Sequence, residues 1–112
     1  MHETALVASI LELVEQHLRQ HQLQKLKKIK LLVGTMSGAS PEALQFAFAA
    51  AVVSTPHQEA ELEIEEVAAE AECSLCGEKF PYQPGTGCPR CHSYFVRLTR
   101  GEELLVEYIE AE

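Results

Sequence analysis

Four cysteines stand in two Cys-x-x-Cys pairs, Cys73 with Cys76 and Cys88 with Cys91, and eleven residues separate the pairs. Each pair can form a tight turn that presents two thiolates to one ion. Four thiolates complete the tetrahedral shell of structural Zn²⁺ and leave no position for water, so the spacing predicts a structural zinc site. Two disulfides and a redox-active Cys-x-x-Cys motif are the alternatives. Disulfides are rare inside cells, and a second pair is one too many for a redox motif.

The N-terminus offers a second set of metal donors. The amine of Met1, the backbone amide nitrogens of His2 and Glu3, and the His2 ring can surround one divalent ion in a square plane. Nitrogen-rich, square-planar sites favour Ni(II) and Cu(II). Because a histidine in second position is a weak signal by itself, a solvated terminal histidine remains the alternative.

The other histidines carry weaker signals. His17 and His21 are four residues apart and could chelate an ion from one helix face, but partial packing or solvation is favoured because no third ligand obviously joins them. His57 follows a proline in a loop and is predicted to face solvent. His92 follows the last cysteine, where it could donate a hydrogen bond to a ligand thiolate or replace one as the pH changes.

The sequence holds no set of residues typical of an enzyme. It lacks a nucleophile elbow, a glycine-rich phosphate loop and a kinase signature. None of its acids pairs with a histidine at a recognisable catalytic spacing. We therefore expect no enzymatic activity.

The elements that must position these residues follow from hydrophobic periodicity. Apolar residues at spacings of three and four predict a helix from Glu3 to about His21. Ser40 as a cap and Pro41 in the first turn predict a second helix that ends before Pro56. Alternating patterns predict two strands, at residues 28–33 and 61–65, and the apolar-rich residues 103–109 indicate a third.

The segment between the second and third strands differs in composition from its surroundings. Residues 73–100 hold all four cysteines and little apolar material, which predicts an inserted module that needs a metal to fold. We expect an α+β fold: two helices packed on a three-stranded, mostly antiparallel sheet, with an inserted zinc-ribbon-like module. The expected domains are an α/β domain of residues 1–68 plus 101–112 and a zinc-binding domain of residues 69–100. A C-terminal strand that returns after an insertion could be exchanged between chains, so a homodimer is possible.

Length and charge limit the partners. The 112 residues include nine Lys and Arg against 17 acidic residues, a net charge of −8, which disfavours nonspecific nucleic-acid binding. Seven glutamates and no basic residue lie between Glu59 and Glu72, which indicates a solvated strand face or, as the alternative, a surface for a basic partner. The longest apolar run, Phe46 to Val53, is too short to cross a bilayer, and no secretory signal precedes it. We expect a soluble, cytoplasmic protein without a membrane partner.

Taken in order, these motifs resemble the HypA family, the nickel-incorporation accessory proteins of NiFe-hydrogenase maturation. The resemblance is carried by Met1-His2-Glu3 with Leu6, Gly34, Ser37, Ser40 to Phe48, Ala60-x-Leu62-x-Ile64-Glu65, Cys73-x-x-Cys76-Gly77-x-x-Phe80, Cys88-Pro89-x-Cys91, Gly101-x-Glu103-Leu104 and Ile109-Glu110. It implies a nickel metallochaperone that holds Ni(II) as transient cargo at Met1, His2 and Glu3, and Zn(II) as a structural ion at the four cysteines. It also implies two partners, the GTPase HypB and the hydrogenase large subunit.

The chain departs from the family pattern at a few positions. Thr35-Met36 stands where members often have a glutamate, Ala68 where a proline often stands, and His92 where a glycine is common. None of these is a proposed ligand. The competing interpretation is a zinc-ribbon module that binds a protein or a nucleic acid and has no role with nickel.

Overall fold

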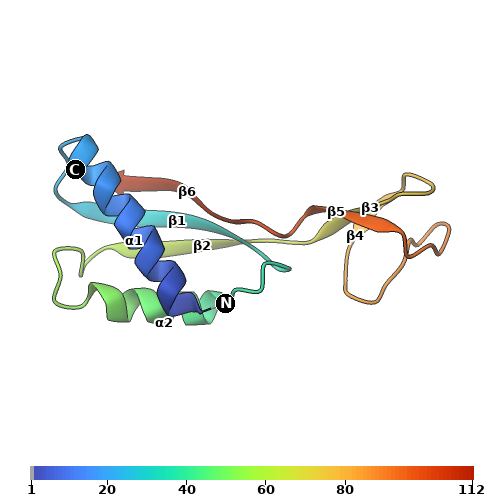
Figure 1. Cartoon of the computed structure of the whole chain (residues 1–112), viewed down its shortest axis with the longest axis horizontal. Helices are drawn as coiled ribbons and strands as arrows, with labels where there is room; N and C mark the ends of the chain where they lie inside the picture. The colour runs from blue at the N-terminus through green and yellow to red at the C-terminus, as the bar shows by residue number, and fades with distance from the viewer. Residues whose placement is uncertain (1) are drawn as a thin grey trace.

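Two small sheets lie end to end in the protein (Figure 1). The computed structural model describes residues 2–112, so Met1 lies outside the described residues. The first sheet contains β1 (Leu26–Gly34), β2 (Glu61–Val67) and β6 (Leu104–Ala111), in the spatial order β2-β1-β6. The second contains β3 (Glu70–Cys73), β4 (Lys79–Pro81) and β5 (Val96–Arg100), in the order β4-β3-β5. The molecule is elongated, with extents of 54 × 25 × 16 Å.

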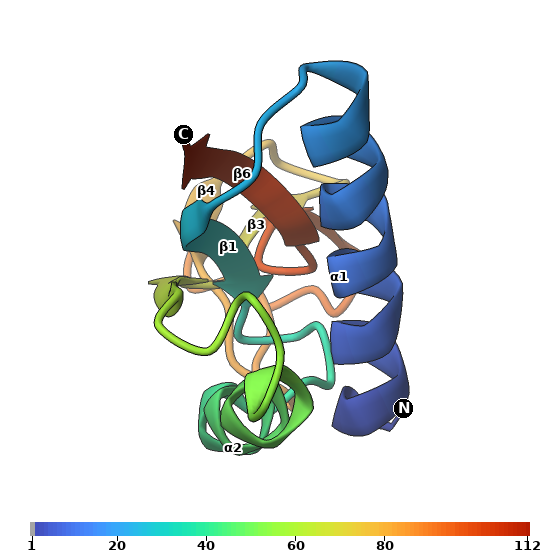
Figure 2. The ribbon, with the colours of Figure 1, turned by 90° about the vertical axis from the view of Figure 1, so that its left-hand side faces the viewer.

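Both predicted helices form, and both lie on one face of the first sheet (Figure 2). The first, α1 (Glu3–Gln20), buries Val7, Val14 and Leu18 from its apolar stripe. The second, α2 (Pro41–Val52), begins as the sequence predicts, because Ser40 Oγ accepts a hydrogen bond from the backbone N–H of Ala43 at 3.2 Å. Every second residue of β1 points into the core between the sheet and the helices, and these residues are Ile29, Leu31 and Val33.

The first sheet is mixed, where the sequence analysis expected a mostly antiparallel one. β1 pairs with β6 in antiparallel fashion, but β1 and β2 are parallel. The chain between β1 and β2 crosses over through α2, and such a strand–helix–strand unit returns the chain in the same direction. The pairs β3–β4 and β3–β5 are antiparallel. The α+β class, the two helices, the three-stranded sheet and the inserted module are confirmed.

The inserted module has its own sheet and its own small core. Its strands are short, and β3 and β5 lie at the two ends of the module, where the chain enters it and leaves it. Ala71 is completely buried at the centre of this sheet, and it packs in one cluster with Cys73, Phe80 and Cys88.

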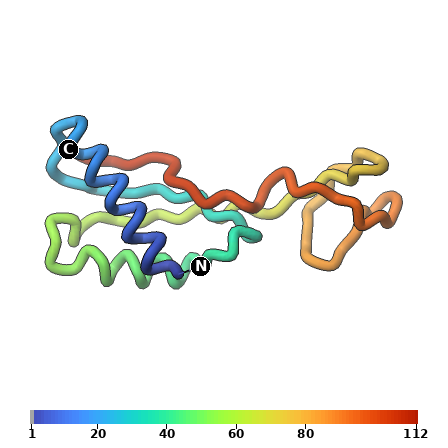
Figure 3. Tube along the Cα trace, viewed as in Figure 1, coloured from blue at the N-terminus to red at the C-terminus, as the bar shows by residue number. Residues whose placement is uncertain are grey.

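The two sheets meet at a joint made largely of backbone. The trace in Figure 3 leaves the first sheet after β2, forms the module and returns through β5 into β6. The loop after β1 bridges the joint, since the N–H of Met36 donates to the carbonyl of Gly101 at 2.7 Å and Thr35 Oγ1 accepts from the N–H of Ala69 at 3.2 Å. Over residues 2–112, neither helix combines the length and hydrophobicity that crossing a bilayer requires.

Candidate metal centres

The four cysteines converge on one point at the far end of the module. Their sulfur atoms all lie within 4.8 Å of one another, and within residues 2–112 they are the one group of three or more potential ligands that meets this condition. The Sγ atoms of Cys73 and Cys91 are 3.5 Å apart, as are those of Cys76 and Cys88. Tetrahedral zinc with bonds of about 2.3 Å requires sulfur separations of about 3.8 Å, so the cluster has nearly the required size.

Each Cys-x-x-Cys pair forms a turn in which backbone N–H groups point at the first sulfur. The N–H of Cys76 donates to Cys73 Sγ at 3.5 Å, and the N–H groups of Arg90 and Cys91 donate to Cys88 Sγ at 3.3 and 3.4 Å. These donors stabilise the negative charge that thiolate ligands bring to a metal. The two turns therefore have the same construction although they come from different segments.

These hydrogen bonds shift the acidity of the first cysteine in each pair. The N–H of Cys76 lowers the pKa of Cys73 to about 6. At Cys88 burial raises the pKa, but the N–H groups of Cys91 and Arg90 outweigh it, and the net shift is downward. The thiolate is the metal-binding form, so the lowered pKa values favour metal binding by the first cysteine of each pair. At Cys76 and Cys91 the backbone N–H groups also act to lower the pKa, but burial and the neighbouring thiols outweigh them, so the pKa of Cys76 is raised to about 12 and that of Cys91 is raised as well.

The residue after each pair closes the turn in a left-handed backbone conformation. Gly77 has φ 80° and its N–H donates to the carbonyl of Cys73 at 3.0 Å. His92 occupies the equivalent place with φ 66°, and its N–H donates to the carbonyl of Cys88 at 2.8 Å. A residue other than glycine is strained in this conformation. His92 thus takes part in the turn through its backbone, and the proposed role of its exposed ring stays a prediction.

The N-terminal donors lie at the start of α1. His2 is the N-cap residue in an extended conformation, and its carbonyl accepts the first helical hydrogen bond, from the N–H of Leu6 at 3.1 Å. The N–H groups of the first helical turn have no partner within a helix. The amide nitrogens of His2 and Glu3 can therefore bind a metal without breaking a helical hydrogen bond. Met1, the third predicted nickel residue, lies outside the described residues.

The side chain of Glu3 ties the start of α1 to the start of α2. Its Oε2 accepts a hydrogen bond from the backbone N–H of Ser40 at 3.2 Å, and this bond lowers the pKa of the Glu3 carboxyl. The carboxylate also lies at the N-terminus of α2, where the helix dipole favours negative charge. The contact fixes the position of the backbone that carries the predicted nickel donors. A groove of ≈ 620 Å³ beside them is lined by residues of both helices, including His2 and the exposed Phe46.

The remaining histidines are placed differently from one another. The rings of His17 and His21 stack with their centroids 4.2 Å apart, and Nδ1 of His21 lies 3.0 Å from the carbonyl oxygen of His17. No third ligand joins them in the described part of the chain. The prediction that His57 faces solvent is wrong: it is 8% exposed, with Nε2 3.3 Å from Glu15 Oε1. Thr55 Oγ1 accepts the N–H of His57, which turns the loop back onto α1.

Comparison with known proteins gives consistent matches over the whole chain. The family model described as "Hydrogenase/urease nickel incorporation, metallochaperone, hypA" matches residues 1–111. A protein of Desulfitobacterium hafniense named hydrogenase maturation factor HypA is 40% identical over 114 residues, which cover 100% of this chain and 99% of the relative. The solution structure of the Ni metallochaperone HypA from Helicobacter pylori aligns with a TM-score of 0.67 at 28% identity, over 99% of this chain and 97% of that one. A second solution structure, of a HypA protein, aligns with a TM-score of 0.74 at 28% identity, over 100% of this chain and 97% of that one.

Proposed function

Because the chain belongs to the HypA family of hydrogenase and urease nickel-incorporation metallochaperones, we propose that it binds Ni(II) at its N-terminus and delivers it to the large subunit of a NiFe-hydrogenase. Members of this family are maturation factors and not enzymes. Nickel is therefore cargo, and the chain needs donors that bind it firmly and release it to a partner. The observation that carries the proposal is the first turn of α1, which presents the His2 ring together with two amide nitrogens that make no helical hydrogen bond.

The nickel donors in this proposal are the amine of Met1, the amide nitrogens of His2 and Glu3, and the His2 ring. Two deprotonated amides balance the charge of Ni(II), so the complex places no net positive charge at the N-terminus of α1, where the helix dipole would oppose it. The Glu3 side chain acts as an anchor through its hydrogen bond with Ser40. Its backbone nitrogen is the atom assigned to the metal.

The four cysteines fit a resident structural zinc. Their sulfurs have the spacing of a tetrahedral site, and backbone N–H groups support the thiolates of Cys73 and Cys88. Zinc at this site supplies a crosslink between two turns that share only a small apolar core. The same proposal places the protein in the cytoplasm, with the GTPase HypB as a partner and a homodimer as a possible form.

The terminal amine gives this proposal a sharp test. An N-terminal extension converts the amine of Met1 into an amide, whereas a C-terminal tag leaves it free. We expect His2→Ala to abolish the d–d absorption band of square-planar Ni(II), and the N-terminal extension to weaken nickel binding nearly as much. Binding should also weaken as the pH falls, because the amine, imidazole and amides must lose protons before they coordinate. Zinc content should stay the same in every variant.

The matched control replaces the stacked pair by His17→Ala with His21→Ala in a chain that has a free N-terminus. This double variant should retain full nickel affinity. If it loses affinity while the N-terminally extended protein keeps it, the terminal-amine site is wrong and α1 holds the metal. A chain with a free N-terminus that binds no nickel would support the competing zinc-ribbon interpretation.

A further inference from the structure

β6 has a free edge along the side of the first sheet. It lies outermost in the order β2-β1-β6, and no strand pairs with its outer side within residues 2–112. β6 runs for eight residues, from Leu104 to Ala111. Proteins usually shield edge strands of this length with Pro, Lys, a β-bulge or a covering segment, because the unpaired backbone groups can pair with another chain. β6 has one such irregularity, a register shift against β1 between Val106 and Tyr108, but its sequence LLVEYIEA contains neither Pro nor Lys.

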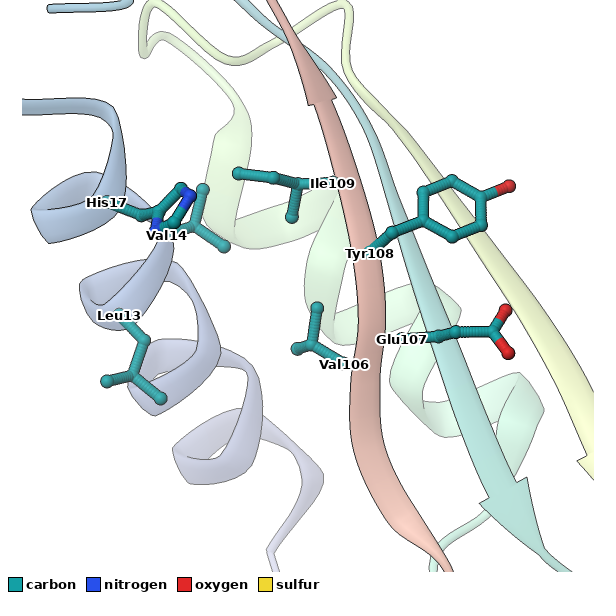
Figure 4. A pocket seen from close by; sticks show the side chains of 7 residues that line it. All are labelled: Leu13, Val14, His17, Val106, Glu107, Tyr108 and Ile109. Carbon is teal, nitrogen blue, oxygen red and sulfur yellow. The ribbon is translucent and has the colours of Figure 1, made fainter. Parts of the chain in front are cut away.

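An apolar groove runs beside this edge, between β6 and α1 (Figure 4). It has a volume of ≈ 470 Å³, and its apolar lining comes from Leu13 and Val14 of α1 and from Val106 and Ile109 of β6. Val106 and Ile109 point toward α1, whereas Glu107 and Tyr108 point away from it. Leu13 is 63% exposed although it borders this apolar surface. An apolar side chain from a strand added at the edge of β6 would cover Leu13 if it pointed toward α1.

The other face of β6 is acidic and partly aromatic. Glu107, Tyr108 and Glu110 are exposed there, and Tyr108 is one of the large apolar side chains left at the surface. From Gly101 to the C-terminus the sequence has glutamates but no Lys or Arg. A strand added at the edge alternates its side chains between the two faces. It would therefore meet apolar side chains on one face and carboxylates on the other.

We propose that the edge of β6 and the groove beside α1 bind an extended segment of a partner protein, in which apolar residues alternate with Lys or Arg. Backbone hydrogen bonds to β6 supply affinity, and the apolar side chains enter the groove beside Leu13. The basic side chains pair with Glu110 and with Glu107, whose carboxylate also lies 3.5 Å from Lys30 Nζ within the sheet. A second copy of β6 fits poorly, because two glutamate-bearing strands would oppose like charges. This surface is separate from the predicted nickel donors at the other end of α1.

A peptide of nine residues that alternates Lys and Val tests the proposal on the full-length, zinc-loaded protein. In ¹⁵N NMR spectra we expect it to shift the amides of β6 and of α1 around Leu13, and to bind more weakly as salt increases. A peptide that alternates Glu and Val should not bind. Leu13→Glu should weaken binding roughly tenfold or more. Val53→Glu, at a similarly exposed site outside the groove, should leave binding unchanged.

Three outcomes would overturn the proposal. Amide shifts at the edge of β2 or spread over all acidic surfaces would show that charge alone attracts the peptide. Equal affinity in Leu13→Glu would remove the groove from the interaction. Sedimentation of a parent dimer that Leu13→Glu dissociates would show that a second copy occupies the edge. Nickel affinity should be equal in the parent and Leu13→Glu, so a failure here is distinguishable from a failure of the nickel proposal.

Discussion

The imidazole of His57 fills the space between the loop after α2 and the side of α1. Nε2 lies 3.3 Å from a carboxylate oxygen of Glu15, while Nδ1 is buried and has no hydrogen-bond partner within residues 2–112. A buried polar atom without a partner costs about 1–3 kcal/mol. The ring therefore contributes packing and one polar contact, and it carries a penalty at its other nitrogen.

Two substitutions at this residue should separate packing from polarity. His57→Ala removes the buried ring and should lower the free energy of unfolding by about 1–3 kcal/mol. His57→Leu keeps most of the volume and removes the unpartnered nitrogen, so it should cost clearly less than the alanine substitution. Urea denaturation followed by circular dichroism measures both. Equal losses in the two variants would show that the contact with Glu15, and not packing, is what His57 contributes.

Single residues were predictable where the signal is local. The four-cysteine metal site can be predicted from the spacing of the cysteines, because the few residues within each Cys-x-x-Cys pair determine its turn. The equivalent positions of Gly77 and His92, each directly after a pair, follow from the same spacing. The burial of His57 has no local signal, since its partner Glu15 lies 42 residues away in the sequence. A proline-containing loop predicts exposure unless the chain happens to fold it against a helix.

At the scale of elements, the open face of the first sheet is organised around one lysine of β1. Lys30 Nζ lies 3.1 Å from carboxylate oxygens of Glu63 and Glu65 and 3.5 Å from one of Glu107. It also lies 5.6 Å from the centre of the Tyr108 ring. The hydrogen bonds to Glu63 and Glu65 raise the pKa of Lys30, and those from Lys28 and Lys30 lower the pKa of Glu63. Part of the glutamate-rich strand is thus paired within the sheet.

Replacing this lysine should destabilise the sheet near neutral pH. Lys30→Met leaves three carboxylates facing one another without their central cation, and the melting temperature at pH 7 should fall by on the order of 5 °C. Lys27→Met is the matched control, because Lys27 makes one exposed ion pair, at 3.7 Å with Glu112. It should change the melting temperature little.

The effect should depend on pH in a defined direction. The pKa of Glu63 is lower in the folded protein, so its stabilising contribution is present above the unfolded pKa and is lost as the pH falls through the folded one. The pKa of Lys30 is raised, so its contribution is present below the unfolded pKa and is lost as the pH rises through the folded one. The difference between the parent and Lys30→Met should therefore shrink in acid. An unchanged difference at about pH 3 would contradict the ion-pair explanation.

Elements were predictable where a long pattern repeats. The two helices and the strands β1 and β2 each carry a clear period over several residues, and the Ser40–Pro41 start of α2 is a local signal. β6 is indicated by its apolar content, because a register shift interrupts its alternation. The strands of the module are three to five residues long, too short to show a period. Their order depends on where the cysteines bring the chain. The parallel pairing of β1 with β2 depends on the path of the chain through α2.

At the scale of the whole molecule, two cores are separated by a joint at which Val67 and Ala69 are buried without belonging to either core. Residues of both helices and the first sheet form one core, and Ala71, Cys73, Phe80 and Cys88 form the other. The radius of gyration is 17.7 Å, whereas a compact chain of this length would have about 13 Å. These observations support the predicted division at residues 69–100, which stays a prediction.

The joint should tolerate no side chain at Gly34. A Cβ atom there would collide with the carbonyl oxygen of Gly101. Neither backbone can move away easily, because the N–H of Gly34 donates to the carbonyl of Glu103 and the carbonyl of Gly101 accepts from the N–H of Met36. Gly34→Ala should lower the free energy of unfolding by roughly 2 kcal/mol or more, measured by urea denaturation. Gly85→Ala is the control, because a Cβ there meets no atom and only its φ of 85° is unfavourable. It should cost about 1 kcal/mol. Equal costs would mean that the joint moves apart easily.

Removal of zinc should unfold one end of the molecule and leave the other folded. The small core of the module includes two of the four cysteines, so the metal must supply most of its folding free energy. Cys76→Ser removes one ligand, and amide protection in β3, β4 and β5 should fall to that of an unfolded chain in hydrogen exchange. Protection in α1, β1 and α2 should persist, because their buried residues belong to the other core. A chelator added to the parent protein should reproduce this pattern, and Ser74→Ala, within the same turn, should not. Loss of amide protection along the whole chain would show that the two cores fold as one unit. Unchanged amide protection in β3, β4 and β5 would show that zinc does not stabilise the module.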